Sequence, residues 1–121
     1  MNNFHVEEIE RIIKAVREDE DGDCDGLYSV IYSLGRDAEN KEEYDFAFSK
    51  LTELFHIGNI SVKARVVQAF SLLAVLKKEI KILDRACVEP LILSAYLRSS
   101  GSDRQIIQDA IDDINLSLNW D

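Results

Sequence analysis

The chain has 121 residues, enough for one domain with a hydrophobic core, and 46% of them are hydrophobic. This composition excludes a disordered acidic tail, and no apolar run approaches the roughly 20 residues that a membrane-spanning helix needs. The N-terminal residues mix charges with apolar positions, unlike a signal peptide. The sequence therefore predicts a single domain, residues 1–121, in the cytoplasm.

Charge is distributed unevenly along the chain. Residues 1–46 carry 14 acidic and 5 basic side chains, residues 47–100 carry 4 and 8, and residues 101–121 carry 5 and 1, for a net charge of −9. Acidic ends around a mildly basic middle disfavour nucleic acid or an anionic membrane as the partner. They favour a cationic partner, although ordinary solubility explains an acidic balance equally well.

Residue types that often carry chemistry are few and scattered. Cys24 and Cys87 lie 63 residues apart, which is not a metal-site spacing, and we interpret them as reduced thiols. His5 and His56 share no spacing with each other or with a cysteine, and the sequence has no H-E-x-x-H, G-x-S-x-G or glycine-rich phosphate loop. We therefore expect neither an enzyme nor a cofactor.

Six stretches have the apolar spacing of amphipathic helices, and none has the alternation of a strand. We expect helices over residues 4–17, 27–37, 41–57, 61–76, 84–99 and 102–118. Pro90 predicts a kink or a late start near residue 90, because proline lacks a backbone donor. Gly101 is expected to end that helix.

Short polar residues and glycine mark the expected ends of the other helices. Asp25 is the expected N-cap of the second helix and Ser61 that of the fourth. Gly58 is expected to end the third helix with a positive φ. Ser102 and Gln105 form an S-x-x-Q capping box that is expected to open the sixth helix.

The same apolar pattern, i, i+3, i+4 and i+7, recurs along the chain. It begins at Leu27, Val66 and Ile107, so the periods are 39 and 41 residues, which is typical of a helical repeat array. Ala69 and Ala110 take equivalent inward positions in this register. We expect an all-α fold of three antiparallel helix pairs stacked as a short α-solenoid. A four-helix bundle also explains the amphipathic stretches, but it does not explain the recurrence.

Residues 90–111 resemble one HEAT repeat. Pro90 lies in the first helix, Asp103 and Arg104 lie near the turn, and small and aliphatic residues follow in the second helix. The middle stretch matches the second half of the repeat at Lys63, Val66, Ala69 and Phe70. The resemblance implies a HEAT-like α-solenoid, which is a binding scaffold whose fold does not specify its ligand.

An acidic chain of this length that contains only HEAT-like helices is also similar to bacterial immunity proteins of the contact-dependent inhibition or polymorphic toxin type. This resemblance rests on size, charge and architecture. It implies a chain that neutralises a cognate protein toxin, often a cationic nuclease such as an RNase, by covering its active-site cleft with an acidic surface. The alternative is a HEAT-type adaptor or regulatory subunit that binds another protein.

The loop at residues 18–25 is the first candidate partner-binding cluster. Its three spaced aspartates, Asp21, Asp23 and Asp25, match the first half of an EF-hand loop. Tyr32 occupies the twelfth position, where calcium needs a bidentate Glu. We therefore interpret the loop as a solvated or partner-binding acidic segment, not as a metal site.

The final helix carries the second acidic cluster, Asp109, Asp112 and Asp113. Like charges at this spacing mildly destabilise a free helix, so an external partner would explain them, although a solvated face is the commoner reason. A helix holds carboxylates more rigidly than a loop, and ordering a loop costs conformational entropy. We expect this cluster to be the stronger determinant of binding.

Outer positions of the three equivalent helices are expected to form one strip. The strip consists of Tyr28, Tyr32, Val67, Ser71, Gln108 and Asp112. The tyrosines are expected either to contact a partner or to pack half-buried against a neighbouring helix. Trp120 is expected either to cover the last apolar face or to be an exposed anchor.

Overall fold

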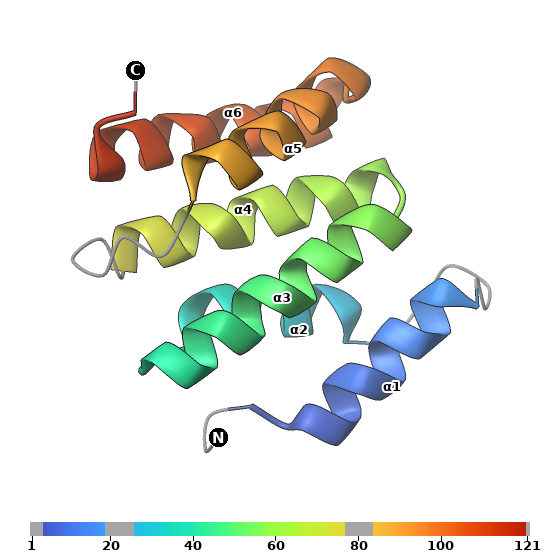
Figure 1. Cartoon of the computed structure of the whole chain (residues 1–121). Helices are drawn as coiled ribbons and strands as arrows, with labels where there is room; N and C mark the ends of the chain where they lie inside the picture. Colours follow the sequence, from blue (N-terminus) through green and yellow to red (C-terminus); the bar gives the residue numbers. More distant parts are fainter. Residues whose placement is uncertain (1–3, 19–25, 77–83, 121) are drawn as a thin grey trace.

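The computed structural model describes residues 4–18, 26–76 and 84–120. These residues form six α-helices and no strand (Figure 1), so the prediction of an all-α chain is confirmed for them. The helices are α1 (Val6–Arg17), α2 (Leu27–Arg36), α3 (Lys41–Ile57), α4 (Ile60–Leu76), α5 (Arg85–Arg98) and α6 (Gly101–Leu118).

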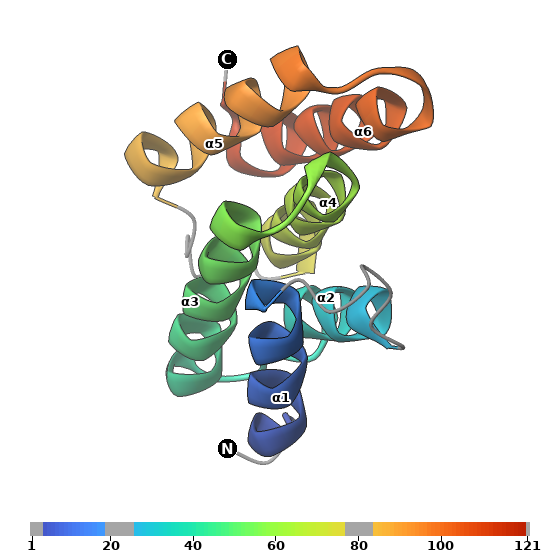
Figure 2. The ribbon, with the colours of Figure 1, turned by 90° about the vertical axis from the view of Figure 1, so that its right-hand side faces the viewer.

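Helix α4 lies at the centre of the packing. It contacts α2, α3, α5 and α6, most extensively α6 and α2. Figure 2 shows α2, α4 and α6 one above another, with α3 and α5 beside them. Because other helices cover α4 on several sides, buried residues occupy most of its circumference. They are Val62, Ala64, Val66, Val67, Ala69, Phe70, Ser71, Leu73 and Ala74.

Apolar side chains of the other helices are also buried. In α1, Ile9, Ile12 and Ile13 are buried. Ala110 of α6 is buried, as is Ala69 at the equivalent position of α4. These apolar faces join one continuous core.

The crossing of α2 and α4 is set by small residues. A methyl group added at Gly35 would lie 2.7 Å from the carbonyl oxygen of Ala69 and 3.1 Å from its Cβ. Gly35 and Ala69 are both buried, so there is no free space into which a larger side chain could turn. Any side chain larger than hydrogen at position 35 would push the two helices apart.

Polar side chains hold the turn between α3 and α4. The Asn59 side chain accepts a hydrogen bond from the Val62 N–H at 2.9 Å and caps α4. Lys63 donates from Nζ to the carbonyl oxygens of Phe55 at 2.6 Å and of Gly58 at 2.7 Å. These two carbonyls would otherwise lack partners at the end of α3. Burial lowers the pKa of Lys63.

Two predictions at this turn are wrong. Ser61 is not the cap of α4, because Asn59 already takes that role and the Ser61 hydroxyl donates to Asp103 of α6 at 3.0 Å. Gly58 has a φ of −85° and a ψ of 163°, an extended conformation open to any residue. The glycine is needed for space, since a Cβ there would overlap the Val62 side chain.

The late start of α5 at Pro90 and the expected beginning of α6 are also wrong. Helix α5 begins at Arg85, capped by Asp84, which agrees with the predicted range 84–99, and it continues through Pro90. Helix α6 begins at Gly101, so Gly101 does not end α5. The expected capping box therefore lies inside α6, and its glutamine, Gln105, bonds along the helix instead.

The N-cap position of α2 is Gly26, with a φ of 85°, while the predicted cap Asp25 lies outside the described residues. A cap that was not predicted occurs at α3. Asn40 accepts from the Glu43 N–H at 2.9 Å, and the fully buried Glu43 carboxylate accepts from the Glu39 N–H at 2.9 Å. This reciprocal pair places a carboxylate at the positive end of the helix, where it is stabilising.

The first prediction tests the α2–α4 crossing. Ala69→Leu would force three extra carbons against Gly35, so we expect the free energy of unfolding to fall by about 1–3 kcal/mol, measured by thermal or urea denaturation. Ala86→Leu, at an exposed position of α5, is the matched control and should change the melting temperature little. An unchanged melting temperature for Ala69→Leu would show that the crossing is not tightly packed.

Candidate protein-binding surface

The outer face of α6 presents three exposed carboxylates, those of Asp109, Asp112 and Asp113. Gln105 donates from Nε2 to Asp109 Oδ1 at 2.9 Å, and Gln108 donates from Nε2 to Asp112 Oδ1 at 3.0 Å. Among the described residues, no ion pair involves any of the three aspartates. Neutral donors therefore orient the carboxylates of Asp109 and Asp112, and no cation among the described residues neutralises their charge.

The predicted strip across the second helices is wrong at its middle. Val67 and Ser71 are buried, with exposed fractions of 0% and 4%, and the Ser71 hydroxyl donates to the Gln68 carbonyl oxygen at 2.6 Å. Since α2 and α6 both pack on α4, the positions that face solvent are shifted along its sequence. The less buried stripe of α4 is Ser61, Arg65, Gln68, Leu72 and Val75.

The tyrosines of α2 are exposed, and each lies beside a guanidinium. Tyr28 is 48% exposed and Tyr32 is 45% exposed. The Arg65 guanidinium lies 5.1 Å from the centre of the Tyr28 ring, and Arg36 lies 5.1 Å from that of Tyr32. Such contacts are favourable cation–π pairs. Each exposed tyrosine of α2 therefore has a cation against its ring, whereas the outer face of α6 carries carboxylates.

A small network holds Arg36 in this position. Its guanidinium donates to both carboxylate oxygens of Asp37, at 2.5 and 2.8 Å, and Ser33 donates to the same carboxylate at 2.9 Å. The hydrogen bonds from Arg36 and then Ser33 lower the pKa of Asp37, because they favour its charged form. Asp37 follows α2 directly, and its ion pair with Arg36 holds the guanidinium over the Tyr32 ring.

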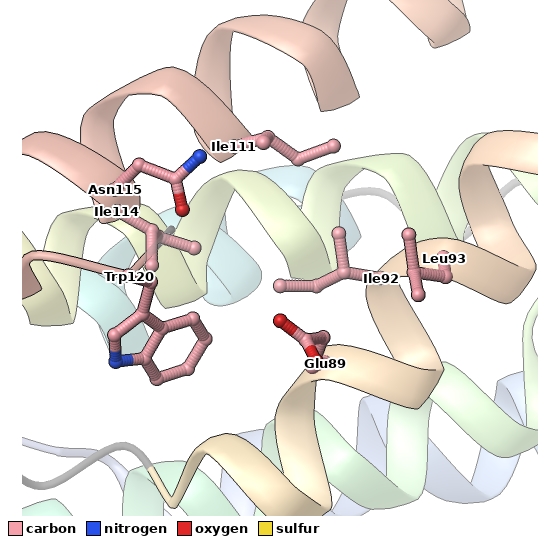
Figure 3. Close-up of a pocket in the computed structure, with 7 residues that line it drawn as sticks. All are labelled: Glu89, Ile92, Leu93, Ile111, Ile114, Asn115 and Trp120. Carbon is pink, nitrogen blue, oxygen red and sulfur yellow. The ribbon is translucent and has the colours of Figure 1, made fainter.

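A pocket of about 190 Å³ opens between α5 and α6 (Figure 3). Its lining residues are Glu89, Ile92, Leu93, Ile111, Ile114, Asn115 and Trp120. Trp120, the only one of these predicted as a site residue, is half-buried against the core and forms one wall. Arg85 lies 5.5 Å from the Trp120 ring centre and donates to Glu89 at 3.0 Å. Arg85 therefore contacts two of the residues that line the pocket.

The predicted acidic loop falls outside the described residues, and Asp21, Asp23 and Asp25 with it. Helix α2 begins at the seventh position of the EF-hand-like pattern, where a calcium loop would still be irregular. In the part of the chain that the structure describes, no group of three or more His, Cys, Asp or Glu side chains is placed to hold a metal ion. Cys87 is exposed, and its thiol donates to Asp84, whose hydrogen bond and charge raise the pKa of Cys87.

Comparison of the chain with protein-family models, curated proteins and solved structures finds no match. Within residues 4–18, 26–76 and 84–120, no helix has the length and apolarity needed to cross a bilayer.

The second prediction concerns acid stability. Asp37 has a lowered pKa in the folded chain, so its charged form stabilises the fold above its unfolded value of about 3.9, and this contribution is lost as pH falls through the folded value. We expect Asp37→Asn to lower the melting temperature at pH 7. The difference from the parent chain should shrink as the pH is lowered below about 4.

Asp45→Asn is the matched control for this measurement. The Asp45 carboxylate is 70% exposed and pairs with Lys41 on the surface, an arrangement that contributes little to stability. Its melting temperature should follow that of the parent chain at both pH values. An Asp37→Asn variant that is equally stable at pH 7 would contradict the stabilising role of the Arg36–Asp37–Ser33 network.

Proposed function

We propose that this chain is an immunity protein that binds and neutralises a basic protein toxin, most plainly a nuclease such as an RNase. The observation that carries the proposal is the outer face of α6. There Asp109, Asp112 and Asp113 are exposed, and no cation among the described residues neutralises them. A rigid anionic face of this kind complements the phosphate-binding cleft of a nuclease.

The proposed architecture is a short HEAT-like α-solenoid of three antiparallel helix pairs. Supporting it are the repeat of about 40 residues and the packing of α4 between α2 and α6, which carry the equivalent apolar patterns. In a solenoid of stacked pairs the second helices lie side by side. The α6 carboxylates would then lie at one end of the stack, next to the less buried stripe of α4.

The proposed mechanism is electrostatic and steric. The aspartates occupy positions in the cleft that substrate phosphates otherwise take, and the body of the protein blocks access. Complementary charge of this kind increases the association rate and sets the orientation of the complex. The inhibition needs neither a cofactor nor a covalent step, and it acts in the cytoplasm, where a toxin of this type would meet its substrate.

Co-expression tests the proposal directly. A gene for a basic nuclease domain is expected beside the gene for this chain. The chain should restore growth to cells that produce that nuclease, and the purified pair should form a stable complex. Growth that is not restored, with no complex in solution, would overturn the immunity function. A complex that forms while the nuclease stays active would instead support the adaptor or regulatory alternative.

The third prediction concerns the α6 face. The double variant Asp109→Asn and Asp112→Asn should weaken partner binding at least tenfold, or about 1.4 kcal/mol, because two oriented charges are lost. Its melting temperature should be equal or slightly higher, since like charges are removed from one helix. Calorimetric titration and a thermal melt measure the two effects.

A matched control removes the same charge elsewhere. Glu42→Gln with Asp45→Asn neutralises two exposed acids of α3 and should leave the affinity within about twofold. Neutralising Asp21 and Asp23 should cost less affinity than the α6 pair. If the loop pair costs more, the acidic loop is the primary contact and the ranking is wrong.

The fourth prediction concerns salt. If carboxylates steer a cationic partner, the association rate should fall steeply as ionic strength rises to 0.15 M, where the screening length is about 8 Å. Stopped-flow mixing, followed by a label on the partner, gives this rate. The α6 double variant should show a shallower dependence, and an association rate that is independent of salt would contradict electrostatic steering.

A further inference from the structure

The pocket between α5 and α6 has the size and lining of a site for a benzene-sized group. Its volume is about 190 Å³, and apolar protein cavities of about 150 Å³ hold benzene. Figure 3 shows the Trp120 ring facing Ile92 across the pocket, with the Glu89 carboxylate between them. The lining is thus mostly apolar, with one polar side chain from each helix, Glu89 from α5 and Asn115 from α6.

The polar groups of the pocket favour a neutral hydrogen-bond donor over a cation. Glu89 and Asn115 are the polar residues of the lining. Arg85 already donates to Glu89 at 3.0 Å and lies over Trp120, so the carboxylate is partly neutralised by the chain itself. A second guanidinium would have to displace Arg85, whereas a hydroxyl or an indole N–H needs only an acceptor oxygen.

The surroundings of the pocket favour a protein as the source of this group. Leu93 lines the pocket and is 52% exposed, and Leu97, one turn further along α5, is 75% exposed. Pro90 lies three residues before Leu93 on the same side of the helix, and it is also exposed. A free small molecule would use the pocket alone, but a protein surface would also cover the neighbouring leucine.

Charge identifies the kind of protein. Helix α6 contributes Ile111 and Asn115 to the pocket, and the exposed Asp112 lies between them in the sequence. A partner that inserts a side chain here therefore also meets an anionic helix, and a basic surface complements it. Buried aromatic anchors flanked by complementary charge are typical of the residues that dominate binding energy.

We infer that this pocket receives a tyrosine side chain, a benzene-sized ring with one hydrogen-bond donor, from the basic protein partner. The inference rests on the proposed function for the identity of the partner as a basic protein. The aromatic ring packs against the apolar side chains that line the pocket, beside Glu89, and its hydroxyl donates to Glu89 or Asn115. Leu97 then contacts the partner outside the pocket.

The pocket can be tested without the partner, with p-cresol as the probe for a tyrosine side chain. Trp120 is the only tryptophan of the chain, so its fluorescence reports on this site alone. Titration should change that fluorescence and shift the amide NMR signals of pocket residues, with a dissociation constant on the order of millimolar for so small a ligand. 4-Methylanisole, which cannot donate a hydrogen bond, should bind at least threefold more weakly. Absence of binding, or equal binding of the two probes, would overturn the inference.

Two variants on one helix separate a protein ligand from a free small molecule. Leu93→Ala should weaken p-cresol binding at least threefold, whereas Leu97→Ala should not change it. Both should weaken binding of the basic partner, because the partner covers both leucines. Since both leucines are exposed, neither variant should unfold the chain.

The results distinguish this inference from the proposed function. If p-cresol binds but neither leucine variant affects the partner, the pocket serves a small molecule and the protein-anchor inference is overturned. The α6 double variant, Asp109→Asn with Asp112→Asn, tests the acidic face independently. Loss of affinity there with an inert pocket would leave the immunity function standing without the aromatic anchor.

Discussion

The close approach of α2 to α4 is the constraint on which the rest of the structure depends. Gly35 and Ala69 bring the two helices together so closely that a single methyl group would meet the backbone of α4. Helix α4 is then covered by α2 on one side and α6 on another, and it anchors α6 through its buried residues. Ile107, Ala110 and Ile114 are the buried residues of α6, so the packing of that face directs the carboxylates to the outer side of the helix.

Periodicity predicts the helices and the core because burial follows the same 3.6-residue spacing as the helix itself. It predicts the ends poorly, because several short polar residues compete for each cap. At the start of α4 both Asn59 and Ser61 are possible caps, and the Asn59 bond to Val62 decides between them. Ser61 is instead engaged by Asp103 of α6, a contact 42 residues away that no local pattern reveals.

The candidate surface was predictable only where one helix carries it. The α6 aspartates are visible as a cluster in the sequence, but a strip across three helices depends on which sides of α4 its neighbours cover. Val67 and Ser71 are buried for that reason, and Arg65 and Gln68 face outward instead. The α5–α6 pocket also requires the fold, since it brings Glu89 and Trp120 together from 31 residues apart.

In the proposed complex, the surface would combine two chemistries that serve different steps of binding. Charges on α6 act at long range, so they would govern how quickly and in which orientation a cationic partner arrives. The pocket would act only after contact, and desolvation of an anchored ring would slow dissociation. In that complex, the acidic face and the pocket share helix α6, so a basic partner that engages both would be held in one orientation.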